Sequence, residues 1–158
     1  MTTMHTATGF RASVRLSAHL QRILIDLITL QLNAKQTHWN LVGRNFRDLH
    51  LQLDEIVDLA RESADTVAER MRAVHAIPDG RPTTVAADTD LPQLPPGEQN
   101  TSTIVDLMTD QLYRTAGALR TVHDEVDAED PTTADLLHQI IGGIEKQAWM
   151  LGSESRSV

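Results

Sequence analysis

Four long stretches of this sequence carry apolar residues at every third or fourth position, which is the repeat of an amphipathic helix. A helix of this kind buries its apolar face only by packing against another element. Four of them in one chain therefore predict an all-α four-helix bundle. The expected helices cover residues 13–38, 44 or 45 to 74, 102–128 and about 131–152.

The starts of the last two helices have capping signals. Thr103 and Asp106 have the spacing of a capping box. For the fourth helix, Asp130 is a candidate cap and Pro131 a candidate first residue. Thr132, with a carboxylate three residues later, is a competing start for the same helix.

Residues 75–101 join the second and third helices and contain five of the six prolines in the chain. Connections of this length without structure are uncommon inside one domain. A bundle in which one long crossover connects two helices explains the segment. We expect a short helix within it, near residues 85–89.

Composition narrows the class of protein. A chain of 158 residues with 41% hydrophobic content fits one globular domain, which we place at residues 13–152 between a flexible tail at 1–12 and a short tail at 153–158. The absence of cysteine excludes disulfides and cysteine zinc sites. No apolar run spans a membrane and the first residues lack a signal-peptide pattern, so we expect a cytoplasmic protein with no membrane partner. The net charge of −8 disfavours binding nucleic acid by charge and suits the collection of cations.

Five side chains of metal-binding type provide the main chemical signal, and four of them lie in the second predicted helix. Two pairs within that helix have a spacing of four, so each pair shares a helix face and can hold an ion. The pairs are eleven residues apart, or roughly 16 Å along a helix, whereas metal–ligand bonds are about 2 Å. A single site using all five therefore needs two antiparallel copies of the helix, which gives two sites per two-fold dimer. The five residues are His38, His50, Asp54, Asp65 and Glu69.

Spacing alone also allows simpler interpretations, and by itself it favours them. His50 and Asp54 fit a hydrogen-bonded surface pair, and Asp65 and Glu69 fit a solvated helix face. His38 fits a histidine near a helix C-terminus, where the helix dipole favours positive charge.

A longer motif changes that balance. The run KQTHWNLVGRNF at 35–46, followed by Leu49-His50 and Asp54-Glu55, resembles the signature of the Dps miniferritins, the DNA-binding proteins from starved cells. Segments at 134–137 and 145–151 resemble the last helix of that family. The resemblance covers roughly residues 15–152, and the flanking residues resemble a mycobacterial member.

The resemblance implies a ferritin-like bundle that assembles into a hollow homododecamer. Such a cage oxidises Fe(II), preferably with hydrogen peroxide, stores a ferric mineral and protects DNA from oxidative damage. The five residues would then be the catalytic ligands of a di-iron site shared between subunits. The chain contains no Glu-x-x-His motif, so it lacks the signature of the di-iron site that larger ferritins build inside one bundle.

Two further features acquire a role from the resemblance. Trp39, next to a ligand candidate, is a possible electron donor, although packing at an interface is the simpler interpretation. The acidic turn after the third helix corresponds to the lining of a three-fold pore that admits iron, with Asp127, Asp130 and Asp135 as candidates. A solvated turn is the alternative, because runs of charge are usually exposed.

DNA binding is the competing function. A nucleoid protein that compacts DNA directly would need basic tails, but the chain has only two lysines, Lys35 and Lys146. Arg11 and Arg15 are the candidate contacts for weak, non-specific binding. A third possibility is a cage that kept the fold and lost the metal chemistry; the intact set of ligands argues against it. We therefore expect a ferroxidase and storage cage.

Overall fold

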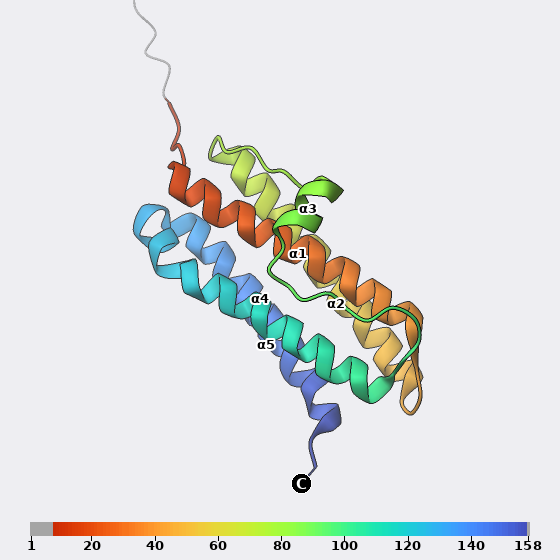
Figure 1. The fold of residues 1–158 in the computed structure, drawn as a ribbon. Coiled ribbons are helices and arrows are strands. Elements are labelled where there is room, and N and C mark those ends of the chain that lie inside the picture. Colours follow the sequence, from red (N-terminus) through yellow and green to blue (C-terminus); the bar gives the residue numbers. More distant parts are fainter. Residues whose placement is uncertain (1–7, 158) are drawn as a thin grey trace, which may run out of the picture.

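Four long helices lie along one another in the computed structural model, which describes residues 8–157 (Figure 1). A short helix and two very short strands lie in the connections between them. The elements are α1 (Val14–Asn40), β1 (Leu41–Val42), α2 (Phe46–Ala73), α3 (Pro82–Asp88), β2 (Gln99–Asn100), α4 (Thr101–Glu129), α5 (Pro131–Gly152) and a final 3₁₀ turn, η1 (Ser153–Ser155). The predicted all-α bundle with one long crossover and a short helix is confirmed.

Capping residues set the observed helix starts. The Ser13 hydroxyl accepts a hydrogen bond from the Leu16 N–H at 3.1 Å, so α1 begins directly after Ser13. Pro131 opens α5 with Asp130 in the cap position, as expected. The capping box predicted at Thr103 is wrong, because Asn100 is the cap of α4 and Thr103 already lies within the helix.

The core lies between two helical hairpins. In Figure 1, α1 and α2 form one antiparallel pair and α4 and α5 form the other, and α1 also packs on α4 while α2 packs on α5. Each of the four long helices contributes side chains with no measurable exposure, so the apolar stripes predicted from the sequence do meet in one core. Among these are Leu27, Leu53, Ile56, Met108, Leu112, Leu119, Leu137 and Ile144.

The crossover runs back along the bundle from the end of α2 to the start of α4 (Figure 1). Its last residues pair in parallel with the segment after α1, with Leu41 opposite Gln99. Gly43 follows this pair with φ +127°, a conformation that side chains rarely adopt. A Cβ at Gly43 would lie 2.9 Å from the Thr101 hydroxyl, so both backbone angle and space require glycine.

Polar side chains of α1 hold the first half of the crossover in place. The Gln21 amide donates to the Asp79 carbonyl at 2.8 Å and accepts from the Asp79 N–H at 2.9 Å. Further along, the buried Asp26 carboxylate accepts from the Thr89 hydroxyl and the Asp90 N–H, both at 3.1 Å. Burial raises the pKa of Asp26, and these bonds partly offset that cost. The segment is therefore anchored at two points on α1.

Within residues 8–157, none of the helices has the length and apolarity needed to cross a membrane. The predicted tail at 1–12 lies largely outside the described residues.

Candidate metal site

His38 near the end of α1 and His50 in the first turns of α2 bind each other's backbone. The Nδ1 of His38 lies 2.8 Å from the carbonyl oxygen of His50, and the Nδ1 of His50 lies 2.9 Å from the carbonyl oxygen of His38. A carbonyl oxygen can only accept, so each Nδ1 carries the proton. A metal ion would then bind the Nε2 of each ring, the nitrogen that these hydrogen bonds leave unused.

The same two rings are held by stacking. Their centroids are 3.6 Å apart with an interplanar angle of 19°, and the ring of Phe46 stacks on His50 at 5.2 Å. His38 is buried, with 6% of its surface exposed. The hairpin between α1 and α2 thus fixes both imidazoles before any metal binds.

Asp54, one turn after His50, lies beside these rings and is paired with a lysine. Lys35 Nζ is 2.6 Å from Asp54 Oδ1, and the same oxygen lies 3.5 Å from His38 Nδ1. The hydrogen bond from Lys35 holds the pKa of the Asp54 carboxyl below its ordinary value. Asp54 is therefore an ionised carboxylate next to two imidazoles.

The other two predicted ligands lie elsewhere on α2. Asp65 and Glu69 are exposed, and eleven residues of helix separate Asp65 from Asp54, which corresponds to roughly 16 Å. In the described part of the chain, no three His, Asp or Glu side chains converge closely enough to hold an ion by themselves. The structure brings together His38, His50 and Asp54 and leaves the second pair apart, so a site shared between chains stays a prediction.

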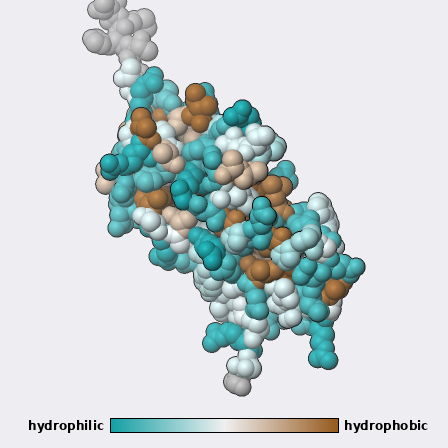
Figure 2. Space-filling model, viewed as in Figure 1, coloured by the Kyte–Doolittle hydropathy of each residue, from teal (hydrophilic) through white to brown (hydrophobic). Residues whose placement is uncertain are grey.

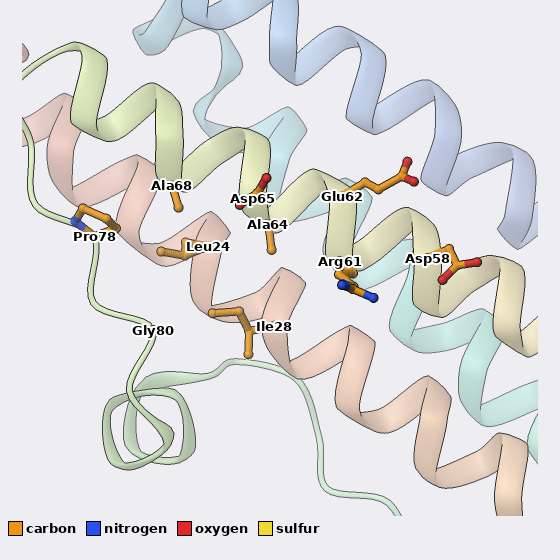
Figure 3. A pocket seen from close by; sticks show the side chains of 10 residues that line it. All are labelled: Leu24, Ile28, Asp58, Arg61, Glu62, Ala64, Asp65, Ala68, Pro78 and Gly80. Carbon is orange, nitrogen blue, oxygen red and sulfur yellow. The ribbon is translucent and has the colours of Figure 1, made fainter.

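Asp65 borders a surface groove between α1, α2 and the crossover (Figure 3). The groove has a volume of about 730 Å³. Its apolar wall comes from Leu24 and Ile28 of α1 and from Ala64 and Ala68 of α2. The remaining lining residues are Asp58, Arg61, Glu62, Pro78 and Gly80. A carboxylate of the predicted metal set thus stands at the edge of a partly apolar hollow.

Large apolar side chains remain exposed on the single chain. Trp39 is 67% exposed, Leu32 58% and Trp149 62%. Figure 2 shows hydrophobic patches set among hydrophilic residues on the face it presents. Exposed apolar area of this kind is typical of surfaces that pack against another molecule. For Trp39, the interfacial interpretation and the role of electron donor both stay predictions.

The three acidic pore candidates lie around the junction of α4 and α5, and only Asp130 lies between the helices, because α4 extends to Glu129. The Asp130 carboxylate is buried and accepts hydrogen bonds from Arg70 Nη2, at 2.7 Å, and from the Thr133 hydroxyl. Asp127 and Asp135 are exposed. The pore role stays a prediction for Asp127, Asp130 and Asp135. The hydrogen bond from Arg70 adds a structural role for Asp130 beyond the expected cap position.

The candidate DNA contacts lie at the start of α1. Arg11 and Arg15 are both exposed. Arg15 Nη1 is 3.7 Å from a Glu125 carboxylate oxygen, so part of its charge is directed to the acidic end of α4. The N-terminal residues before position 8 lie outside the described part.

Lys35 is the site residue that sequence reasoning missed. A signal was available, because Lys35 and His38 are three apart and thus share a helix face. Its contact with Asp54 depends on how α1 and α2 pack, which spacing within one helix does not reveal.

Comparisons with known proteins identify the family and the fold. A family model described as a ferritin-like domain matches residues 17–156. "DNA protection during starvation protein 2" of Deinococcus radiodurans is 38% identical over 135 residues, covering 84% of this chain. The chain spans 55% of the length of that relative.

Solved structures of Dps proteins have the same fold as this chain. Dps92 of Deinococcus radiodurans superposes with a TM-score of 0.88 at 33% identity, covering 91% of this chain and 87% of its own. Dps of Mycobacterium smegmatis gives a TM-score of 0.88 at 25% identity, with 96% of each chain covered.

Proposed function

Because this chain belongs to the Dps family of ferritin-like proteins, we propose that it oxidises Fe(II) at sites shared by two chains and stores the ferric product. The observation that carries the proposal is that His38 and His50 are both held through Nδ1, which leaves the Nε2 of each ring available to a metal ion. The Asp54 carboxylate lies next to them, with Oδ1 3.5 Å from His38 Nδ1. Fixing ligand atoms in advance is expected of a metal site and is unnecessary for a surface hydrogen bond.

The five residues divide into two half-sites. His38, His50 and Asp54 supply two nitrogens and a carboxylate, and Asp65 and Glu69 of an antiparallel second chain supply two more carboxylates. Mixed nitrogen and oxygen ligands suit iron in both oxidation states, and the carboxylates offset the added charge of Fe(III). The exposed, partly apolar groove next to Asp65 is a surface on which a second chain would pack.

Two iron ions held close together can transfer two electrons to one molecule of hydrogen peroxide. Each Fe(II) gives one electron, so two of them reduce one hydrogen peroxide, with two protons, to two waters. Transfer of both electrons at one place avoids the release of hydroxyl radical. The iron is substrate and cargo, and its removal together with peroxide would protect nearby DNA.

For the whole assembly we propose a homododecamer in the cytoplasm. The exposed apolar patches support association, and the formal charge of −8 on each chain favours attraction of Fe(II) over direct compaction of DNA. Direct DNA binding is the second candidate function, and it depends on Arg11 and Arg15.

Complementation between two inactive variants tests the shared site. His50→Ala damages one half-site and Glu69→Gln damages the other. In cages assembled from equal amounts of both chains, each half-site is intact with a probability of about one half. About a quarter of the shared sites then have two intact halves, so peroxide-dependent oxidation should return to about a quarter of the wild-type rate.

The controls separate this result from general damage. Cages of either variant alone should be close to inactive. Asp106→Asn, an exposed position on α4 outside both the ligand set and the groove next to Asp65, should keep the wild-type rate. If mixed cages stay as inactive as the separate variants while remaining assembled, the site is not shared between chains.

A further inference from the structure

Lys35 makes the shortest contact with the candidate metal site. Its Nζ is 2.6 Å from Asp54 Oδ1, and its side chain is 33% exposed. The oxygen it binds is the one that lies 3.5 Å from His38 Nδ1, on the side of the imidazoles. A metal ion that used this oxygen would have to share it with an ammonium group or replace it.

We propose that Lys35 is an internal counter-cation that occupies the Asp54 carboxylate until a divalent metal ion displaces it. This inference rests on the proposed iron site. Lysine suits the role, because its ammonium is a compact charge on a flexible stem and exchanges partners without the fixed two-point geometry of arginine. The pair is also partly exposed, and such ion pairs contribute little stability, so a divalent ion can break it.

A second position for the displaced ammonium lies close by. Lys35 Nζ is 6.0 Å from the centroid of the Trp39 ring, and the two residues are four apart on α1. An ammonium is attracted to the face of an indole at about this distance. When a metal ion takes Asp54, Lys35 moves away from the carboxylate and onto the ring.

The counter-cation has a consequence for when the site fills. One chain alone offers three ligands, and an ammonium competes for one of them. An assembled pair adds Asp65 and Glu69 of the second chain, and these extra carboxylates bind the metal ion tightly enough for it to displace the Lys35 ammonium from Asp54. Lys35 therefore ties metal loading to the assembled cage.

Zinc titration of the assembled cage tests this proposal, because Zn²⁺ takes nitrogen and carboxylate ligands and undergoes no redox reaction. In a Trp149→Phe background, Trp39 is the only tryptophan of the chain and reports on its own surroundings. Lys35→Met removes the charge and keeps an apolar stem. Lys146→Met is the matched control, since Lys146 is the only other lysine.

We expect Lys35→Met to bind Zn²⁺ about fivefold more tightly than the parent, the factor given by loss of a partly exposed ion pair. Lys146→Met should match the parent. Zinc should shift the Trp39 emission of the parent but leave that of Lys35→Met unchanged, because the variant has no ammonium to move. Lys35→Arg keeps the charge and should bind Zn²⁺ no more tightly than the parent, which guards against an effect of altered packing.

Other outcomes identify which idea fails. Unchanged or weaker zinc binding by Lys35→Met, while His50→Ala abolishes binding, overturns the counter-cation role alone. If His50→Ala binds Zn²⁺ as well as the parent does, the proposed metal site fails and the role of Lys35 fails with it.

Discussion

Replacing Asp130 by asparagine should lower the free energy of unfolding of the bundle, although the substitution only exchanges a carboxylate oxygen for an amide nitrogen. Asp130 occupies the cap position of α5, and its carboxylate accepts hydrogen bonds from Arg70, at 2.7 Å, and from the Thr133 hydroxyl. The Arg70 and Asp130 side chains are only 22% and 10% exposed, so solvent cannot take over these bonds. A hydrogen bond to a charged group contributes about 1.5–3 kcal/mol. Because asparagine keeps one acceptor oxygen, we expect a loss of about 2 kcal/mol.

Urea unfolding at one fixed protein concentration measures this loss, since assembly makes the midpoint depend on concentration. With a denaturant slope of about 2 kcal/mol per molar, the midpoint should fall by about 1 M. Asp127→Asn is the matched control, because Asp127 is exposed in the last turn of α4, three residues before Asp130. Equal midpoints for the two variants would refute the structural role of Asp130.

The same comparison has a defined pH dependence. Burial alone would raise the pKa of Asp130, but the hydrogen bonds from Thr133 and Arg70 outweigh it and hold the pKa below the ordinary value. A lowered carboxyl pKa contributes stability that is complete above the unfolded pKa of about 3.9 and is lost as the pH falls through the folded value. The difference between Asp130→Asn and wild type should therefore be full at neutral pH and shrink below about pH 4.

Three further predictions follow from the turn, the strand junction and the N-terminal segment. Replacing both Asp127 and Asp135 by asparagine should slow iron loading at low salt and have little effect at high salt, because salt screens the attraction of Fe(II) to an acidic entry. Stopped-flow ferric absorbance measures the loading rate. A rate equal to that of wild type at low salt would show that these residues are only solvated surface charges. Gly43→Ala should lower the free energy of unfolding by about 1–2 kcal/mol, since its φ is +127°; an unchanged melting temperature would contradict the strain. Glutamine at both Arg11 and Arg15 should weaken salt-sensitive retardation of DNA in a gel shift. Equal retardation by the variant and wild type would exclude these two arginines as contacts.

The helices were predictable because their signals are local. Ser13 and Pro131 mark helix starts by their own chemistry, and the structure begins α1 and α5 directly after Ser13 and at Pro131. The capping box at Thr103 was wrong because α4 begins earlier, at Thr101, with Asn100 in the cap position just after the proline-rich segment. The pairing of β1 with β2 was missed, since two residues in each strand are too few to show an alternating pattern.

For the candidate site, residue types and spacing indicated which side chains to examine, and packing decided what each one does. The sequence placed His38 and His50 in one motif, but the hydrogen bonds from each ring to the other residue's backbone carbonyl depend on the turn that joins α1 and α2. Asp127 and Asp130 look alike in an acidic run, and only the position of Arg70 on a distant helix separates a buried cap from an exposed charge.

The long crossover also has a consequence for the order of folding. Its strand pair joins Leu41 to Gln99, and closing a loop of nearly sixty residues costs about 4 kcal/mol of chain entropy. Contacts next to the turn of each helical hairpin span much shorter stretches of chain, so the turn ends of the α1–α2 and α4–α5 hairpins should form before the crossover docks. His38 and His50 both belong to the first hairpin, so half of the proposed iron site would be assembled while the bundle is still open.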